Sequence, residues 1–307
     1  MKAAFLGTPA SAVPSLAGLA DVVDIELVVT RPDAAINRSK NPQPPPVKVA
    51  AMEWGLEIVQ PKSGAELLLA LKNRDLDVGV VVAYGHILTP KILARTRMGF
   101  VNIHFSLLPR WRGPAPVERA ILSGDTATGV SLMSIDDGID TGPVIAIRET
   151  QIDPDETAGS LTKRLSFMGA ELLKGTLGGF LSGVRRPAAQ IEAGVTKAPP
   201  LTTAEACLQI GESVDTASRK IRAYNPRPGA WINLGSTRLK IWSASKSDIP
   251  LAAGHIDVFD GMPHLGLPGG SLRLERVQPA GKISMKGDEW WIGRHIDTGP
   301  VTIGSLG

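Results

Sequence analysis

The sequence has almost no cysteine and lacks a long apolar run. Cys207 is the single cysteine among 307 residues, which excludes an internal disulfide and weakly favours a reducing compartment. The longest apolar runs, such as 78–83, are far shorter than the roughly 20 residues that cross a bilayer. The N-terminus carries one charged side chain and leads into a Gly-Thr-Pro turn, unlike an export signal. We therefore expect a cytoplasmic protein without membrane contact.

A large excess of charge of one sign is also missing. The formal net charge is only +3. Residues 1–205 hold 21 Lys+Arg and 21 Asp+Glu, whereas residues 206–307 hold 12 and 9, so the excess lies in the last third. This mild basic bias is compatible with a polyanionic partner, although an ordinary solvated surface would also produce it. Gly7-Thr8-Pro9 is neither a GxGxxG nor a Walker sequence, so a nucleotide-phosphate loop has no support.

In the first half of the chain, short apolar runs alternate with segments of helical spacing. The runs are continuous, as expected for parallel strands buried on both faces, and predict strands over Lys2–Gly7, Ile25–Thr30, Leu56–Gln60, Asp77–Tyr84, Phe100–His104, Val130–Ile135 and Val144–Ile152. Helices are predicted over 13–19, 65–74 and 157–183, the last one with interior glycines at 169, 175, 178 and 179. The alternation predicts an α/β fold with a doubly wound, mostly parallel, Rossmann-like sheet. Its ligand crevice would lie at the carboxyl ends of the strands.

A change in composition predicts a second domain. The stretch 184–205 is rich in Pro, Ala, Thr and Lys, which is typical of a linker, so we expect domains at 1–183 and 206–307. Beyond it, 204–225 has helical character. Five short runs with turn signals between them predict a small OB-like β-barrel, with strands at Ala230–Leu234, Arg238–Trp242, His255–Phe259, Leu272–Val277 and Trp290–Ile292.

Candidate chemistry is concentrated between Asn102 and Asp140. Asn102 and His104 are two residues apart on a predicted strand, so their side chains point to the same face. An amide can donate to an oxyanion, an imidazole can carry a proton, and a nearby carboxylate can orient it and favour its charged form. These are the groups that acyl transfer to an amine needs. From spacing alone, a structural role for the Asn-X-His pair, and a turn or metal-ligand role for Asp140, stay open.

The motifs themselves resemble a known family. The segment 102–116, Asn-Ile-His-Phe-Ser-Leu-Leu-Pro-Arg-Trp-Arg-Gly-Pro-Ala-Pro, is similar to the signature of formyltetrahydrofolate-dependent transferases, and Asp140-Thr141-Gly142 is similar to their second motif. Segments 221–229 and 277–282 resemble C-terminal marks of the tRNA-acting members. The resemblance implies formyl transfer from 10-formyltetrahydrofolate to the α-amine of an initiator methionyl-tRNA. It assigns catalysis to Asn102, His104 and Asp140, and folate contacts to Ser106, Leu107, Leu108, Pro109, Val82, Ala83 and Tyr84.

The resemblance also implies a tRNA contact in the loop 31–41. Arg38 and Lys40 supply the basic charge there, but the glycines usual in the family are missing. We expect a monomer. We also expect no metal site, because the histidines show no metal-ligand spacing with one another or with Cys207. Three other functions stay open. They are formyl transfer to an amino-sugar nucleotide, hydrolysis of the formyl-folate by water, and RNA binding without catalysis.

Overall fold

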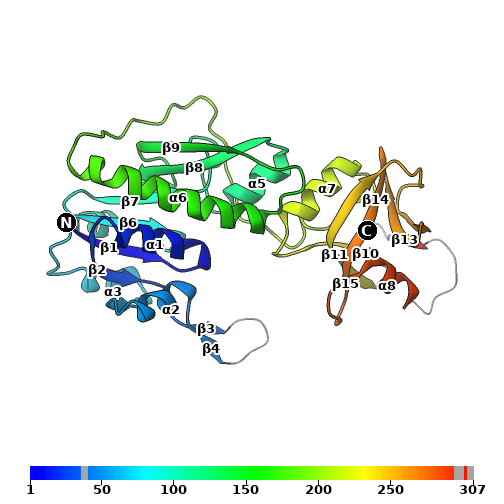
Figure 1. Ribbon diagram of the computed structural model, residues 1–307, viewed down its shortest axis with the longest axis horizontal. Helices are drawn as coiled ribbons and strands as arrows, with labels where there is room; N and C mark the ends of the chain where they lie inside the picture. Colours follow the sequence, from blue (N-terminus) through cyan, green and yellow to red (C-terminus); the bar gives the residue numbers. More distant parts are fainter. Residues whose placement is uncertain (36–40, 294–300, 303–307) are drawn as a thin grey trace. The chain divides into compact units, whose positions relative to one another are not determined.

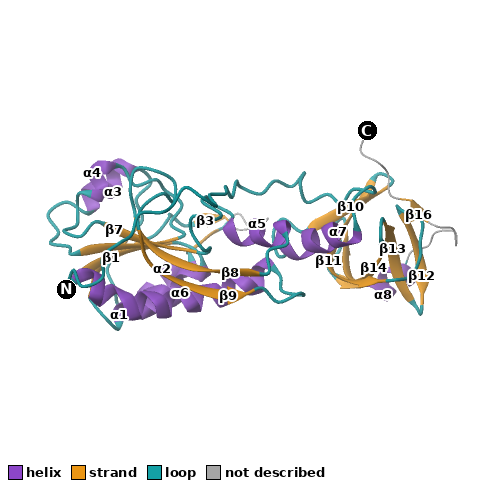
Figure 2. Cartoon of the chain, turned by 90° about the horizontal axis from the view of Figure 1, so that it is seen from above, coloured by secondary structure: helices purple, strands orange, loops and turns teal. Residues whose placement is uncertain are grey.

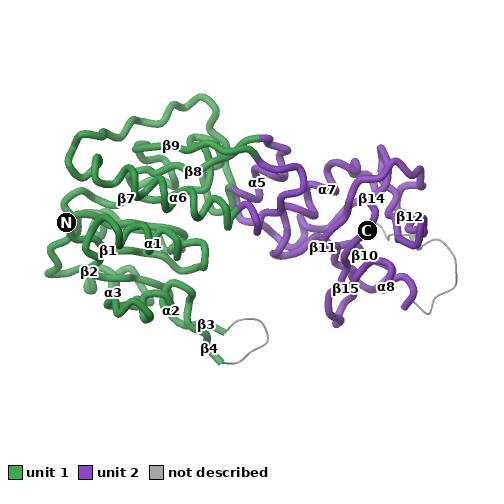
Figure 3. Tube along the Cα trace, viewed as in Figure 1, with its two compact units in different colours: residues 1–116, 127–151, 162–198 green, residues 117–126, 152–161, 199–307 purple. Residues whose placement is uncertain are grey.

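The computed structural model describes residues 1–35, 41–293 and 301–302 and divides into two compact units. Unit 1 comprises residues 1–116, 127–151 and 162–198, and unit 2 comprises the remainder of the chain (Figure 3). This grouping differs from a linear division at residue 183, because 117–126 and 152–161 group with the C-terminal part of the chain. In the ranges that the structure describes, no helix combines the length and apolar character needed to cross a membrane.

Unit 1 is built on a seven-stranded sheet. The strand order is β5-β2-β1-β6-β7-β8-β9. Pairs from β5 through β7 are parallel, and β8 and β9 are antiparallel additions. The bounds are β1 Lys2–Gly7, β2 Asp24–Val29, β5 Ile58–Val59, β6 Val78–Val82, β7 Phe100–His104, β8 Ala127–Ser134 and β9 Val144–Gln151. This arrangement and the antiparallel domain described below confirm the predicted fold class.

Both faces of this sheet are covered by helices, as its continuous apolar strands require. Alternate residues of β1 enter opposite cores, Ala3 and Phe5 on one side and Ala4 and Leu6 on the other. Helices α1, α2 and α6 contribute to the first core, and α3 and α4 contribute to the second (Figures 1 and 2). Their bounds are α1 Val13–Ala20, α2 Pro46–Glu53, α3 Gly64–Ala70, α4 Pro90–Leu93 and α6 Ala158–Leu181, with a 3-10 turn at Ala10–Ala12 and a hairpin of β3 Ala34–Ala35 and β4 Pro42–Gln43.

Helix α6 is continuous despite its interior glycines. Gly169 lies against β7, where an added Cβ would be 2.7 Å from Cγ2 of Ile103. A larger side chain would therefore push the helix away from the strand that ends at His104. Gly175 and Gly178 have open space and Gly179 has only a distant neighbour, and the packing of Leu173, Leu177 and Phe180 keeps the helix on the sheet.

Unit 2 contains the antiparallel domain. Its sheet runs β10-β11-β14-β13-β12-β16, with β15 paired to β14. The bounds are β10 Ala230–Leu234, β11 Thr237–Ser247, β12 His255–Phe259, β13 Met262–Leu267, β14 Gly270–Pro279, β15 Met285–Lys286 and β16 Val301–Thr302, with helices α5 Pro116–Ser123, α7 Val214–Ala223 and α8 Gly287–Ile292. The core gathers Tyr224, Trp231 and Trp290 among aliphatic side chains.

Two expectations for this part of the chain were wrong, and one strand was missed. Residues 290–292 end helix α8 and form no strand, because the Glu289 carboxylate accepts the backbone N–H of Lys286 and starts a helix there. The segment 204–213 is made of turns, so helix α7 begins only at Val214, capped by Ser213. Strand β13 was not predicted, since Pro263 and Gly266 suggest a break in the sequence.

Candidate active site

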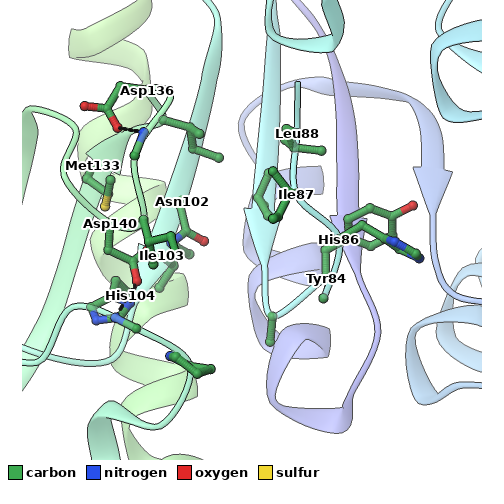
Figure 4. A pocket seen from close by; sticks show the side chains of 18 of the residues that line it. Tyr84, His86, Ile87, Leu88, Asn102, Ile103, His104, Met133, Asp136 and Asp140 are labelled. Atoms are coloured by element: carbon green, nitrogen blue, oxygen red, sulfur yellow. Dashed lines mark hydrogen bonds and ion pairs between the residues drawn. The ribbon is translucent and has the colours of Figure 1, made fainter. Parts of the chain in front are cut away.

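The candidate catalytic residues begin at the carboxyl end of β7. Asn102 lies between Val81 of β6 and Met133 of β8, and His104 is opposite Ser131. The period of the strand points the side chains of Asn102 and His104 to the same face. His104 is buried, whereas Asn102 is partly exposed. Asp140, from the loop between β8 and β9, joins them on the same wall of a cavity (Figure 4).

Both ring nitrogens of His104 face oxygen atoms. Nε2 is 2.9 Å from the backbone oxygen of Trp111, and Nδ1 is 3.6 Å from Oδ2 of Asp140. A carbonyl oxygen can only accept, so Nε2 carries a proton in this arrangement. A second proton on Nδ1 would make the imidazolium and pair it with the carboxylate. The geometry therefore places the Asp140 carboxylate where it could pair with an imidazolium at His104.

The loop that carries Asp140 has an unusual backbone. Asp140 adopts the left-handed conformation with φ +52°, and its Oδ2 accepts a hydrogen bond from the backbone N–H of Gly113 at 2.8 Å. At the start of the loop, Oδ1 of Asp136 accepts from the N–H of Gly138 at 3.1 Å and from the Thr141 hydroxyl at 2.7 Å. The carboxylate of Asp140 is thus held by the first motif, between His104 and Gly113.

A cavity of about 660 Å³ opens in front of these three residues, a size that suits a cofactor-sized ligand. The opposite wall comes from the segment after β6, which carries Tyr84, His86 and Ile87, across the space from Asn102 and Asp140 (Figure 4). The lining is mostly apolar and is formed by Val81, Ala83–Leu88, Asn102–Phe105, Gly113, Pro114, Pro116, Met133 and Ile135–Asp140. Such a site can enclose a planar ring and present it to a small set of polar groups.

Tyr84 is the buried phenol of this wall. It is only 2% exposed, and burial raises its pKa to about 12, against a weaker lowering by Arg31. Its backbone oxygen accepts from the hydroxyl of Thr8 at 3.2 Å, which ties the end of β6 to the end of β1. The phenol of Tyr84 therefore stays protonated to a higher pH than that of an exposed tyrosine.

The structure separates the predicted folate contacts into two groups. Ala83 and Tyr84 line the cavity, whereas Val82 and the segment 106–109 are absent from its lining. Ser106 is fully buried, donates to the backbone oxygen of Arg110 at 2.6 Å and accepts through its own carbonyl from the hydroxyl of Ser131 at 2.7 Å. The same hydroxyl accepts from the N–H of Leu108 at 3.1 Å. These residues hold the turn behind His104.

Two other expectations concern residues outside this cavity. Arg38 and Lys40, the predicted tRNA contacts, lie outside the described residues. Nearby, Lys48 forms an ion pair with Asp33 at 2.8 Å, so that lysine is already partnered. Among the described residues, no group of three or more His, Cys, Asp or Glu side chains is placed to hold a metal ion.

Sequence reasoning did not place His86 at the cavity. The structure shows that it lines the cavity and lies 5.4 Å from Tyr84, centroid to centroid. Its Nε2 is buried without a hydrogen-bond partner in the part of the chain that the structure describes. Its place directly after the predicted strand end at 83–85 was the only signal in the sequence.

The arrangement is equipped for acyl transfer to an external nucleophile. Asn102 can offer a neutral donor, His104 can carry a proton, and Asp140 offers a carboxylate beside that imidazole. The described residues that line the cavity include no serine, cysteine or lysine. Such a site suits an attacking group brought by a substrate, with the protein able to supply electrostatic stabilisation and proton transfer.

Comparison with known proteins assigns both parts of the chain to one family. Residues 2–177 match the formyl transferase family, and residues 200–295 match the formyl transferase C-terminal domain. A methionyl-tRNA formyltransferase of Mycobacteroides abscessus is 38% identical over 301 residues, covering 97% of this chain and 98% of that protein.

Solved structures share the fold at lower identity. The N-formyltransferase of Helicobacter canadensis, solved with folinic acid and dTDP-3-aminofucose, has a TM-score of 0.66 at 17% identity and covers 92% of this chain and 100% of that one. HypX from Aquifex aeolicus, solved with tetrahydrofolic acid, has a TM-score of 0.67 at 15% identity and covers 94% of this chain. This chain spans about half of HypX, at 46% of its length. The resemblance predicted from the motifs is confirmed, and the chain belongs to the formyl transferase family.

Proposed function

We propose that this enzyme transfers the formyl group of 10-formyltetrahydrofolate to the α-amine of initiator methionyl-tRNA. The observation that carries the proposal is the convergence of Asn102, His104 and Asp140 on one cavity wall, in a chain whose curated relatives of nearly equal length are methionyl-tRNA formyltransferases. A folate-derived formyl donor fits this family, and the cavity is large enough for its ring system.

The reaction needs one bond made and one broken. The unprotonated amine attacks the formyl carbon, a new C–N bond forms, and the carbonyl π pair moves to oxygen. Asn102 donates to that oxyanion, and the positive charge of His104 stabilises it. When the intermediate collapses, the bond from carbon to N10 of the folate breaks, and N10 leaves with the electron pair. The proton lost by the amine balances the proton that N10 takes up, and His104 with Asp140 lies beside that route.

The folate ring would occupy the apolar side of the cavity. Ala83 and Tyr84 are the predicted contacts that line it, and the proposal keeps them as direct contacts. The other predicted contacts would support the lining indirectly, by fixing the strand end and the turn that carry it; they are Val82, Ser106, Leu107, Leu108 and Pro109. Arg38 and Lys40 stay predicted tRNA contacts. The cytoplasmic location and the monomeric state also stay predictions.

Formyl transfer to an amino-sugar nucleotide is the second candidate. The specific observation in its favour is the shared fold with an N-formyltransferase solved with dTDP-3-aminofucose. The relatives at 38% identity over almost the full chain favour the tRNA acceptor, because the similarity includes the C-terminal domain as well as the reaction centre.

An experiment with each acceptor in turn distinguishes the two candidate functions. The full chain is given 10-formyltetrahydrofolate together with either initiator methionyl-tRNA or dTDP-3-aminofucose, and formylated product is measured by mass spectrometry. We expect N-formylmethionyl-tRNA and no formylated sugar, and digestion of the acceptor with ribonuclease should abolish the reaction at low acceptor concentration. Formylation of the sugar nucleotide alone would refute the tRNA assignment. Formate release without any acceptor would make the enzyme a hydrolase.

A further inference from the structure

The segment between the two family domains takes part in building the reaction centre. The family matches end at residue 177 and resume at residue 200, and the composition of 184–205 is typical of a linker. Residues 188–198 are nevertheless hydrogen bonded to both motif regions. Ala188 exchanges two backbone hydrogen bonds with Val144 at 2.7 and 2.8 Å, just beyond the Asp140 loop. Thr196 accepts the N–H of Arg112 at 2.9 Å, and the Arg112 carbonyl accepts from Ala198 at 2.7 Å.

Gln190 is a side chain of this segment that is hydrogen bonded to both motif regions. Its Nε2 donates to the backbone oxygen of Asp140 at 2.9 Å and to that of Gly142 at 2.8 Å. Its Oε1 accepts from Nε of Arg112 at 3.0 Å, and the Arg112 side chain is only 12% exposed. Both N–H groups and the oxygen of the amide are thus used. One amide joins the first motif to the loop of the second.

These hydrogen bonds hold the backbone at a residue with an unfavourable conformation. Asp140 is in the left-handed region, which an L-residue with a side chain occupies at a cost. The two carbonyls that Gln190 holds belong to Asp140 and to the residue two positions later. Fixing them sets the direction in which the Asp140 carboxylate leaves the loop, toward the Gly113 N–H and Nδ1 of His104.

We propose that Gln190 is a positioning residue of the reaction centre, which acts through Asp140 and makes the segment 188–198 part of the catalytic unit. The proposal rests on the catalytic role of Asp140 proposed above. Gln190 does not line the cavity, so it is not expected to contact either substrate. Its contribution should therefore appear in the rate of transfer and leave substrate binding nearly unchanged.

The first test is Gln190→Glu. The carboxylate keeps the acceptor for Arg112 but has no N–H for the two carbonyls, so only the bonds to the Asp140 loop are lost. A misplacement of about 1 Å in a catalytic group can reduce the rate by roughly 100-fold, so we expect kcat to fall about 10- to 100-fold. The KM for 10-formyltetrahydrofolate should change less than about threefold, since only interactions specific to the transition state are lost.

Two further variants separate positioning from other effects. Gln190→Met removes the two bonds to the Asp140 loop and also the acceptor for Arg112, without adding a charge, and should show at least the same loss of kcat. Gln151→Glu makes the same change as Gln190→Glu at an exposed side chain at the end of β9, outside the cavity lining, and should leave kcat unchanged. Near-ultraviolet circular dichroism establishes that each variant is folded. A normal kcat in a folded Gln190→Glu or Gln190→Met would overturn the proposal, and so would a loss confined to KM.

A double-mutant cycle tests the route through Asp140. Single-turnover rates are measured for Asp140→Asn, Gln190→Glu and the double variant. If Gln190 acts through the Asp140 carboxylate, Gln190→Glu should reduce the rate of the Asp140→Asn enzyme by less than about threefold, because residues that act as a unit are not additive. If the rate loss of the double variant equals the product of the two single losses, Gln190 acts independently of Asp140, and the inference is overturned. If Asp140→Asn alone has no effect, the proposed catalytic set fails, which is a different result.

Discussion

Replacing Asp140 by Asn removes one charge and almost no volume. The same Oδ2 atom accepts from Gly113 at 2.8 Å and faces Nδ1 of His104 at 3.6 Å, and an amide oxygen can keep the first contact. The loss is therefore mainly the attraction between the carboxylate and the imidazolium. With an effective dielectric constant of about 20 to 40, Coulomb's law gives about 2.3 to 4.6 kcal/mol at this separation. If the transition state depends on that charge, kcat should fall roughly 50- to 2000-fold.

The assay is single-turnover formyl transfer with enzyme in excess, followed by the formation of N-formylmethionyl-tRNA. Donor binding is measured separately by fluorescence titration and should stay within about threefold of wild type, since the charge matters most as the oxyanion forms. Asp75→Asn is the matched control, because it removes an exposed carboxylate beside Arg97. A loss smaller than about fivefold in Asp140→Asn would refute the electrostatic role of Asp140.

Two further predictions concern stability. Gly113 has φ +127°, and an added Cβ would be 2.6 Å from the Ala198 backbone oxygen. Gly113→Ala should therefore lower the unfolding free energy measured in urea by roughly 2 kcal/mol more than Gly55→Ala, because Gly55 is also left-handed but has open space around it. Equal losses of unfolding free energy in the two variants would contradict this. Burial raises the folded-state pKa of Tyr84 to about 12, so its contribution is complete below about pH 10 and is lost as the pH rises toward 12. Tyr84→Phe should therefore flatten the fall in unfolding free energy between about pH 10 and 12 by up to about 1.4 kcal/mol per pH unit, and parallel curves for the two proteins would refute it.

The core of unit 1 could be predicted because its strands are buried on both faces. The run Phe100–His104 appears in the structure with the predicted bounds, and Asp77–Tyr84 contains β6. The strand prediction for residues 290–292 was wrong because two tryptophans and an isoleucine are typical of a strand in composition. Its structure depends on the Glu289 carboxylate capping the chain three residues earlier, and on Trp290 packing into the unit 2 core.

The reaction centre was only partly predictable. The spacing of Asn102 and His104 places them on one strand face, which a period of two guarantees. Asp140 is distant in sequence, and only the family resemblance linked it to them. Gln190 could not be found this way, since it lies in a stretch that composition assigns to a linker and its role depends on contacts with Arg112 and the Asp140 loop. Sequence periodicity carries no information about such contacts.

The most direct test of the proposed reaction centre is formylation of initiator methionyl-tRNA by the wild-type chain and by His104→Ala, with 10-formyltetrahydrofolate as the only donor. We predict that the wild type forms N-formylmethionyl-tRNA and that His104→Ala binds the donor but transfers at least about 100-fold more slowly, since an electrostatic group of the oxyanion site is lost. Transfer by His104→Ala within a few-fold of the wild type would contradict this account of the reaction centre, and no transfer by the wild type would contradict the proposed function.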